Sequence, residues 1–434
     1  MSNDLQSLEY QASELRKQGQ FEEAIPLYEK LWQATPTKWI GWGYAFCLRR
    51  VGRSAEALEI CRAVFNLDPN FDRNNSLYGW CIYDTCIKQP AETIDEATFL
   101  KAAEAITQLT SQGDYSPYEI TVFAVIKYFE KREEKQKPVP YNKIMEWLDK
   151  LDVSQLSAVA VRGSDGKSYP SPREKWYTSR SKALLALERY EECIDICSRA
   201  LQEFRRLHYD YDIWFRIQRA QCYLKLGRFA EAGSDLKYAI ERKPDPWIRH
   251  RYAQALYEVG QLDEAIRYAA EAALPSQRLG YRWEVFLDLG LMLAEKGENE
   301  LAAKHILLAA AIRREESWVK VPPRLRDALN LYRLSDENIP PAKTLHRELQ
   351  SFWKSMKPRP RTTHTGVIAT IHANEKSGHI TGDDGKRYFF STQNYKGSQK
   401  PVQNLRVAFN LRETISKKTG LPEIHAIDVI EEGA

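Results

Sequence analysis

Hydrophobic and polar residues follow two different periods along the 434-residue chain. In most segments of residues 1–356, apolar residues recur every three or four positions, a spacing that predicts amphipathic helices. From Thr365 onward, segments such as "TGVIATIHA" and "NLRVAFNLRE" place apolar residues at alternate positions, which predicts short β-strands. The chain is therefore predicted to be mainly α, with a small β domain at residues 364–434.

The helical part contains a recurring turn signature. Gly is followed by Ala five positions later in five copies, at Gly19, Gly52, Gly227, Gly260 and Gly297. In the first three copies, Pro stands seventeen positions after the Gly. Another copy has Glu188 and Cys193 at the Gly and Ala places. Gly allows the chain to reverse, a small residue allows close contact between helices, and Pro ends the second helix. A helix-turn-helix repeat is therefore expected.

This pattern resembles the tetratricopeptide repeat (TPR), whose period is close to the 33 residues between Gly19 and Gly52. The TPR register places small residues of close helix contact at Ala12, Ala45, Ala220, Ala253 and Gly290. We expect a TPR-like α-solenoid over residues 1–356, with regular repeats at about 5–70 and 174–315. Degenerate helical pairs are expected at about 74–172, ending in a polar connector at 161–172.

The TPR resemblance implies a concave groove, lined by the first helix of each repeat, that binds peptides or extended protein segments. The register places these residues on the groove side: Trp39, Trp42, Phe46, Trp214, Trp247, His250 and Tyr257. The alternative interpretation is that the aromatic rings pack between successive repeats. Both interpretations remain open from the sequence alone.

The β domain follows a basic, Pro-containing linker at residues 357–363, which is expected to be extended. Its segment "GVIATIHANEKSGHITGDDGKRYFFS" resembles the cold-shock domain, a five-stranded OB-fold barrel that we expect to be antiparallel. The strand-one Lys and Trp of that family are replaced here by Ala369 and Thr370. The two exposed Phe residues of its second strand are replaced by Ser377 and His379.

The cold-shock resemblance implies a face that binds single-stranded nucleic acid. Strand alternation directs Tyr388 and Phe390 inward. The candidate face consists of Lys376, His379, Lys386, Arg387, Phe389 and Ser391. Cations in and before the linker are also candidates for phosphate contacts, namely Lys354, Lys357, Arg359 and Arg361. With few rings on this face, weak and sequence-tolerant binding of single-stranded RNA or DNA is expected, and RNA is the favoured hypothesis.

Composition adds little to this interpretation. Lys and Arg exceed Asp and Glu by 63 − 59 = 4, so any basic surface must be local. The seven cysteines show no metal-ligand spacing, and we expect buried, reduced thiols such as Cys193 and Cys197. The first residues lack the apolar core of a signal peptide, and no segment has the length of a membrane span. A cytoplasmic protein without metal or cofactor is expected.

Catalytic motifs are not apparent in the sequence. It contains no Walker loop, no G-x-S-x-G, no H-E-x-x-H and no kinase signature set. His208 lies near Asp210 and Asp212, where a solvated turn is expected. The favoured hypothesis is a non-enzymatic adaptor that holds a protein partner in the groove and binds single-stranded nucleic acid through the barrel. The alternative is a purely protein-binding scaffold, or an accessory subunit of a prokaryotic stress or defence complex, whose barrel does not bind nucleic acid.

Overall fold

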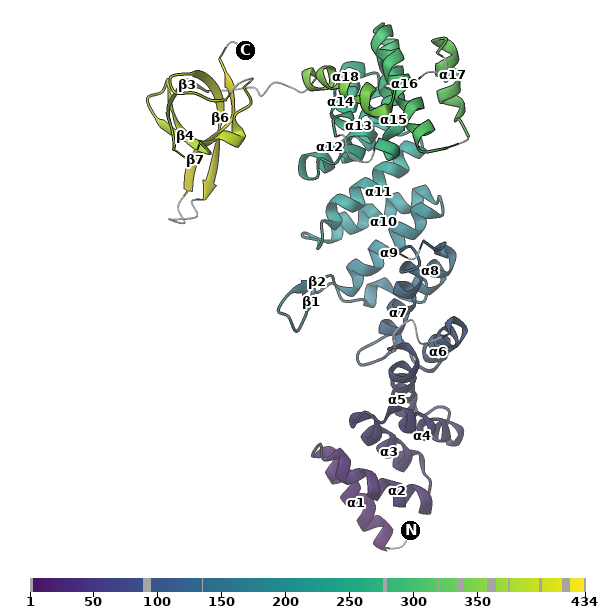
Figure 1. The fold of residues 1–434 in the computed structure, drawn as a ribbon. Coiled ribbons are helices and arrows are strands. Elements are labelled where there is room, and N and C mark those ends of the chain that lie inside the picture. The colour runs from purple at the N-terminus through teal and green to yellow at the C-terminus, as the bar shows by residue number, and fades with distance from the viewer. Residues whose placement is uncertain are drawn as a thin grey trace. The chain divides into compact units, whose positions relative to one another are not determined.

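The computed structural model describes residues 3–88, 95–134, 136–275, 279–318, 320–334, 339–356, 364–373, 375–397, 400–415 and 422–432. Figure 1 shows the chain as a series of helices that ends in a barrel. The chain divides into two compact units, one of residues 1–272 with 288–302 and one of residues 273–287 with 303–434. The predicted linker at 357–363 lies outside the described residues.

The helical elements follow the predicted helical periodicity. The first regular helices are α1 (Asn3–Lys17), α2 (Phe21–Ala34), α3 (Lys38–Arg50), α4 (Ser54–Leu67) and α5 (Asp72–Ile82), which continues into a π-helical turn (Tyr83–Ile87). They are followed by α6 (Glu96–Leu109), α7 (Tyr118–Glu130), α8 (Tyr141–Leu148), α9 (Pro172–Ala186), α10 (Tyr190–Glu203), α11 (Tyr211–Lys225), α12 (Phe229–Arg242), α13 (Pro246–Glu258) and α14 (Leu262–Ala273). The last helices are α15 (Trp283–Glu295), α16 (Asn299–Glu315), α17 (Pro323–Leu331) and α18 (Ala342–Ser355).

Helix pairs of the first unit pack as the repeat signature predicts. Each helix from α1 to α4 contacts the next one, and α1 and α5 both contact α3 (Figure 1). The predicted small residues Ala12, Ala45, Ala220 and Ala253 are completely buried, so neighbouring helices approach closely at these positions. The chain therefore contains a TPR-like array of helix pairs. The segment 74–172 also contains helices, from the end of α5 to α8.

The turn between the two helices of a repeat requires a left-handed residue. Gly227 has a φ of +72°, and a Cβ atom there would meet only Phe229, at 4.0 Å. Glu188 occupies the same turn position with a φ of +59°. The left-handed conformation destabilises a residue with a Cβ atom by about 1–2 kcal/mol. The turn between α9 and α10 is therefore strained where the others are not.

Replacing Glu188 by Gly is expected to raise the free energy of unfolding by up to about 1 kcal/mol, because the relief of strain exceeds the extra entropy of Gly in the unfolded chain. The reverse change, Gly227→Ala, is expected to lower it by about 1–2 kcal/mol. Urea unfolding of the full chain, followed by circular dichroism, measures both changes. A less stable Glu188→Gly variant would contradict this explanation of the turn.

The predicted connector at 161–172 contains a small hairpin rather than a plain loop. Two-residue strands, β1 (Val161–Arg162) and β2 (Ser168–Tyr169), pair in antiparallel orientation. Gly166 at the turn has a φ of +76°, and the backbone N–H of Gly163 donates to the Lys167 carbonyl at 2.9 Å. A short Gly-containing turn is enough to pair the flanking residues. The polar composition of the segment did not predict this hairpin.

The barrel at the end of the second unit has five strands: β3 (His364–Ile371), β4 (Ser377–Gly382), β5 (Arg387–Ser391), β6 (Arg406–Ile415) and β7 (Pro422–Glu431). They close in the order β3-β4-β5-β7-β6. The core side chains are Ile368, Ile380, Tyr388, Phe390, Val407, Phe409, Ala426 and Val429. The predicted inward orientation of Tyr388 and Phe390 is therefore confirmed.

The prediction of a purely antiparallel barrel is wrong, because β5 and β7 pair in parallel orientation. All other neighbouring strands of the barrel are antiparallel. Five strands in a closed ring cannot all alternate in direction, so at least one neighbouring pair must be parallel. This parallel pair joins Phe389 to His425 and Phe390 to Ala426. It therefore brings the last strand against the predicted nucleic-acid face.

Candidate functional site

Three of the predicted groove residues gather on the first helix of the second repeat. The rings of Trp39 and Trp42 lie 6.4 Å apart, and those of Trp42 and Phe46 lie 5.7 Å apart. Trp42 and Phe46 line a hollow of about 660 Å³, together with Trp80 of α5 and Tyr115. The Trp80 indole N–H donates to the Tyr115 carbonyl at 2.7 Å. This part of α3 and α5 therefore combines aromatic rings with an accessible hollow.

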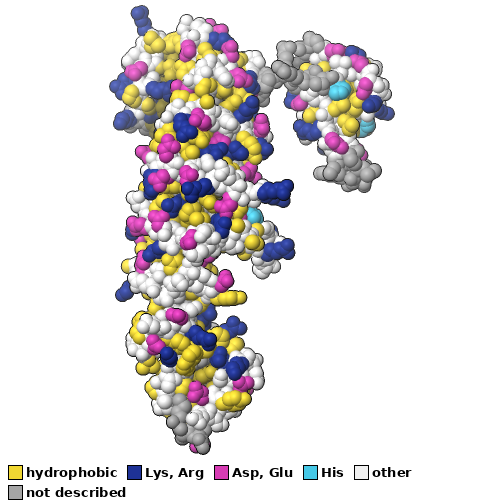
Figure 2. Space-filling view, turned by 180° about the vertical axis from the view of Figure 1, so that it is seen from behind, with side chains coloured by type: hydrophobic (Ala, Val, Ile, Leu, Met, Phe, Trp, Pro, Cys, Tyr) yellow, Lys and Arg dark blue, Asp and Glu magenta, His cyan; other side chains and the backbone are white. Residues whose placement is uncertain are grey.

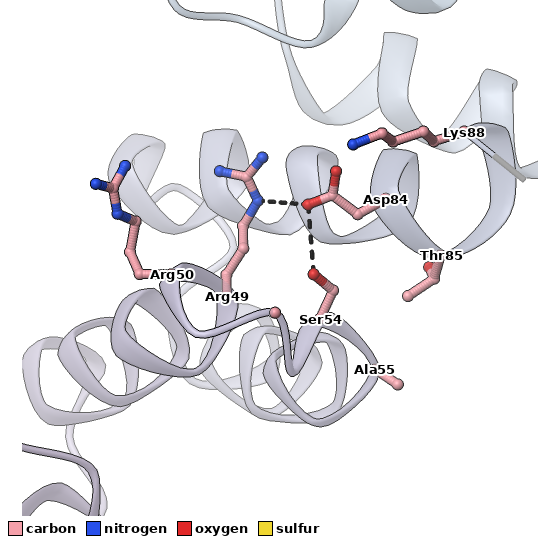
Figure 3. Close-up of a pocket in the computed structure, with 8 residues that line it drawn as sticks. Arg49, Arg50, Ser54, Ala55, Asp84, Thr85 and Lys88 are labelled. Atoms are coloured by element: carbon pink, nitrogen blue, oxygen red, sulfur yellow. Dashed lines mark hydrogen bonds and ion pairs between the residues drawn. The ribbon is translucent and has the colours of Figure 1, made fainter. Parts of the chain in front are cut away.

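A second hollow, of about 620 Å³, lies beside the turn between α3 and α4 and is also lined by Arg49. Figure 3 shows Arg49, Arg50 and Lys88 around it, with Asp84 between Arg49 and Ser54. The Arg49 Nε donates to Asp84 at 2.8 Å, and the Ser54 hydroxyl donates to the same oxygen at 3.3 Å. Asp84 is thus already engaged, and Arg50 and Lys88 add positive charge to this hollow.

A separate pair of predicted groove residues is stacked. The rings of Trp214 on α11 and Trp247 on α13 lie 6.2 Å apart at 16°. Each is more than one-third exposed, at 37% and 38%. The Lys243 ammonium lies 4.5 Å above the Trp214 ring. The two rings therefore pack against each other between neighbouring repeats, as the second interpretation of the groove aromatics predicts, and each keeps exposed surface. Partner binding by these rings stays a prediction.

The last two residues predicted to line the groove, His250 and Tyr257, both contact a carboxylate on another helix. His250 is only 6% exposed, and its Nε2 lies 2.8 Å from an Asp288 oxygen on α15. The Tyr257 hydroxyl donates to Glu295 on the same helix at 2.5 Å. These partners are 38 residues away in sequence, so helix register alone did not identify them. His250 is a buried packing residue, and Tyr257 links α13 to α15.

On the barrel, Phe389 lies between two histidines on neighbouring strands. It is directly opposite His379 on β4 and His425 on β7, with ring separations of 5.7 and 4.8 Å. His372, just after β3, is 6.3 Å from the same ring. Figure 2 shows histidine side chains beside hydrophobic ones on one face of the barrel. The face therefore carries four rings, which we call the Phe389–histidine face.

Sequence reasoning identified two of these four rings and missed His372 and His425. His372 follows the last paired residue of β3, and its Nε2 lies 3.2 Å from the Nδ1 of His379. His425 reaches the face only through the parallel pairing of β7 with β5. The position of His372 in the segment "TIHA", directly after β3, could have indicated that its ring lies near this face. The parallel strand pair that places His425 had no such signal.

The polar residues predicted for this face are also at its edges. The Arg387 guanidinium donates to the Thr370 hydroxyl at 3.1 Å, and the Ser391 hydroxyl donates to the Lys376 carbonyl at 3.4 Å. Lys386 is exposed and directly precedes β5. Among the more distant cations, Lys354 is exposed on α18, whereas Lys357, Arg359 and Arg361 lie outside the described residues.

Partial burial affects the protonation of His379 at neutral pH. Burial lowers the pKa of His379, and the nearby charges of Arg387 and His372 lower it further. His379 is therefore neutral at pH 7 and can present its ring as a flat apolar surface. An anion near the ring would shift the balance toward the protonated form, because opposite charges stabilise one another.

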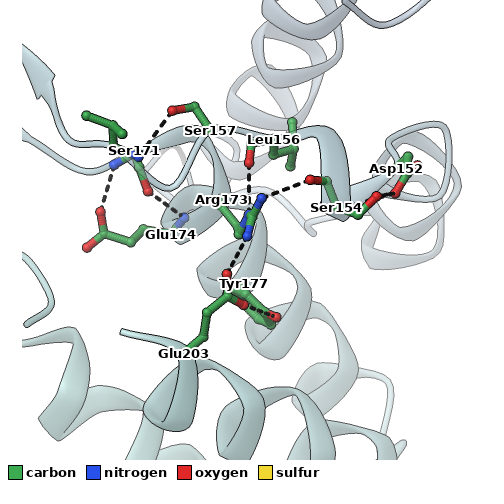
Figure 4. A network of polar contacts seen from close by, with 10 residues as sticks. Asp152, Ser154, Leu156, Ser157, Ser171, Arg173, Glu174, Tyr177 and Glu203 are labelled. Carbon is green, nitrogen blue, oxygen red and sulfur yellow. Dashed lines mark hydrogen bonds and ion pairs between the residues drawn. The ribbon is translucent and has the colours of Figure 1, made fainter. Parts of the chain in front are cut away.

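The segment around His208 forms a turn with exposed residues, and His208 itself also joins a polar network. The His208 Nδ1 lies 2.9 Å from the carboxylate of Glu174, which is 2% exposed and belongs to the capping box of α9. Next to it, Arg173 donates to the carbonyls of Leu156 and Ser154 and to Glu203 (Figure 4). The network ties the irregular segment to the regular repeats, so its role is explained by the fold.

The cysteines follow their predicted environment. Six of the seven are buried, and Cys86 is half-buried. Burial raises the pKa of the Cys47 thiol to about 11, which keeps it protonated and unreactive at neutral pH. Among the described residues, no three His, Cys, Asp or Glu side chains are grouped as metal ligands. In the same part of the chain, none of the helices combines the length and apolar character needed to cross a membrane.

Parts of the chain are similar to a known family and to solved helical-repeat structures. A family model described as a domain of unknown function (DUF7017) matches residues 213–350. No curated protein matches the chain. Among solved structures, YrrB, described as a TPR protein with an unusual peptide-binding site, is 19% identical, with 49% of this chain and 92% of that chain covered and a TM-score of 0.36.

Two further solved structures are similarly distant. The TPR2AB domain of yeast Sti1 in its pHSP90 complex is 14% identical, with 70% of this chain and 99% of that chain covered and a TM-score of 0.26. A monomeric mutant of IFIT1 with Gppp-AAAA is 12% identical, covers 78% and 72%, and has a TM-score of 0.34. At these values the site must be interpreted from the chain's own residues.

Proposed function

We propose that the protein is a non-enzymatic adaptor. Its TPR-like helices bind a segment of a partner protein, and its barrel binds single-stranded RNA through the Phe389–histidine face. The observation that carries the nucleic-acid part is the Phe389 ring, which lies between His379 and His425 on an exposed barrel face with Arg387 at its edge. The TPR-like fold itself suggests protein–protein interaction.

The strand order supports an OB-fold interpretation of the barrel. The three strands β3, β4 and β5 are consecutive and antiparallel, and β6 returns to lie beside β3. This is the Greek-key order, and β7 closes the ring between β5 and β6. OB-fold barrels bind oligonucleotides across their second and third strands. Those strands are here β4 and β5, which carry His379 and Phe389.

The rings of the Phe389–histidine face fit unpaired bases rather than a duplex. Each base of a single strand offers a flat surface, and stacking on an aromatic side chain contributes about 1–3 kcal/mol per base without sequence preference. Phe389 is half-buried and lies between imidazoles on both sides, so its ring is held in place before a base arrives. Lys386 and Arg387 at the edge of β5 supply positive charge for the phosphates.

Phe389→Ala is expected to weaken binding of a labelled oligo-U by about 1–3 kcal/mol, because one stacking surface is lost. The double variant Lys386→Ala/Arg387→Ala is expected to weaken binding generally and to reduce its dependence on salt, because fewer counterions are released. Fluorescence anisotropy with the full chain at two salt concentrations measures both effects. No binding by the wild type at low salt, or unchanged binding by Phe389→Ala, would contradict the proposal.

Affinity for oligo-U is also expected to rise as the pH falls from about 7.5 to about 5.5, by up to about tenfold per pH unit for one proton taken up. The lowered pKa of His379 leaves the free ring neutral at pH 7, and phosphates favour its protonated form. His379→Gln should bind with less pH dependence. If the pH dependence of this variant equals that of the wild type, His379 does not titrate with binding.

The lowered pKa of His379 makes barrel stability depend on pH in the opposite direction to binding: stability falls as the pH falls. The folded-state pKa of His379 lies below its unfolded value, so its contribution to barrel stability is present above about pH 6.5 and is lost as the pH falls toward the folded-state pKa. Thermal melts at each pH therefore accompany the binding measurements. They ensure that binding is compared only where the barrel is folded.

A further inference from the structure

We infer that the groove formed by α1, α3 and α5 binds an acidic segment of the partner protein, in which Asp and Glu flank one bulky apolar side chain. This inference rests on the proposed protein-binding function of the TPR-like helices and adds the chemistry of the partner. It depends on three arginines that lie over aromatic rings, Arg16, Arg50 and Arg73. We call them the ring-stacked arginines.

The ring-stacked arginines are held over indole and phenyl faces. The Arg16 guanidinium carbon is 4.8 Å from the Trp42 ring centroid, and that of Arg73 is 5.7 Å from the same ring. Arg50 lies 5.2 Å from the Phe21 ring. Such cation–π contacts fix the guanidinium plane. The Arg16 Nε donates to the Tyr28 hydroxyl at 3.2 Å, which holds this group further and leaves its terminal N–H groups for an anion. Each of these guanidinium groups is therefore already oriented before an anion binds.

The arginines at the repeat turns provide a contrast. Arg53, Arg189 and Arg228 each follow the turn residue of a repeat, and each forms an ion pair with a Glu three positions later. Among the described residues, neither Arg16, Arg50 nor Arg73 forms an ion pair with a carboxylate. These turn arginines are neutralised within the chain. The charge of the ring-stacked arginines is instead left for a partner.

The two hollows add an apolar site and further positive charge. The larger hollow is lined by Trp42, Phe46, Leu77 and Trp80, which suit a bulky apolar side chain. Asp72 is the only carboxylate among its described lining residues. In the adjoining hollow, Asp84 is already bound to Arg49 and Ser54, while Arg50 and Lys88 line the same space. Positive charge is therefore in excess, and an acidic segment is complementary to it.

Nucleic acid is the other anionic polymer to consider, and the ring contacts disfavour it here. A base must stack on an accessible ring face. Arg16 and Arg73 both lie against Trp42, and the Arg49 guanidinium carbon is 4.9 Å from the Trp80 ring centroid. Stacking a base would displace these guanidinium groups. A carboxylate side chain instead binds their edges and leaves the cation–π contacts in place.

The test uses the folded full chain and a random library of displayed peptides of about 12 residues. We expect the selected peptides to be rich in Asp and Glu around a Trp, Phe or Leu. A labelled selected peptide should bind at least about tenfold more weakly to Arg73→Gln, Arg16→Gln and Trp42→Ala, and its binding should weaken with salt. The control is Arg347→Gln, an exposed arginine on α18, which should leave the affinity unchanged.

Three results would overturn the inference and can be told apart. Selection of neutral or basic peptides whose binding is lost in Trp42→Ala would mean that the groove binds protein of another chemistry. Oligo-U binding that weakens in Arg73→Gln but not in Phe389→Ala would mean that the groove binds nucleic acid. No selection above background would also remove the protein-binding part of the proposed function, while the oligo-U measurement on the barrel would stand separately. Circular dichroism and melting confirm that each variant is folded.

Discussion

Replacing Phe390 by Ala is expected to destabilise the barrel by about 3–5 kcal/mol. The ring is completely buried and packs in a core of eight buried residues. A small domain has only a few kcal/mol of stability in reserve, so this loss is expected to unfold the barrel at physiological temperature. Limited proteolysis of the full chain should then cleave within residues 364–432, while the helices keep their circular dichroism signal.

Phe389→Ala is the matched control, because the two rings are adjacent on β5 and point to opposite faces. This variant should leave the barrel resistant to the protease and should affect oligo-U binding alone. Equal resistance of Phe390→Ala and the wild type would contradict the core assignment. Equal sensitivity of both variants would contradict the separation into a core ring and a binding ring.

Replacing Asp235 by Asn is expected to lower the free energy of unfolding of the helical part by about 3 kcal/mol. Asp235 on α12 is 2% exposed and accepts hydrogen bonds from Arg219 Nε and Nη2, both at 2.7 Å, and from Arg216 Nη1 at 3.1 Å. Removing the carboxylate leaves two partly buried guanidinium groups without their counter-charge. The Arg219 and Arg216 side chains remain 18% and 28% exposed. The expected loss of stability is therefore at the lower end of the about 3–5 kcal/mol that breaking a buried ion pair costs.

Asp195→Asn is the control for this prediction. Its ion pair with Arg199 also links an Asp and an Arg, but both side chains are more than half exposed. An exposed pair of this kind contributes about 0–1 kcal/mol. Urea unfolding of both variants gives the difference directly. If Asp235→Asn is no less stable than Asp195→Asn, the buried network does not hold α11 against α12.

Local signals in the sequence were sufficient to predict the array of helix pairs and the change to strands near residue 364. A turn Gly, a small residue and a helix-ending Pro each act within one repeat, so their spacing predicts helix pairs wherever they recur. The change of period after Thr365 predicts strands for the same reason, because the side chains of a strand alternate between two faces. Tyr388 and Phe390 were placed in the core by this alternation, and both are buried.

Contacts between distant segments were not accessible to this reasoning. His250 has the register of a groove residue, but the carboxylate that binds it comes from Asp288 on a helix of the next repeat. His425 joins the Phe389–histidine face only because β7 closes the barrel parallel to β5. The ring-stacked arginines likewise come from three helices. Only the packed helices show that these arginines have no carboxylate partner among the residues that the structure describes.

The most direct test of the adaptor proposal is to locate bound RNA on the full chain. Ultraviolet cross-linking of a thiouridine-containing oligo-U, followed by mass-spectrometric mapping of the cross-linked residues, reports where the bases lie. We expect the main cross-links at Phe389 and its neighbours His372, His379 and His425, and we expect their loss in Phe389→Ala. Cross-links confined to the helices, or none above the level of the Phe389→Ala variant, would contradict nucleic-acid binding by the barrel.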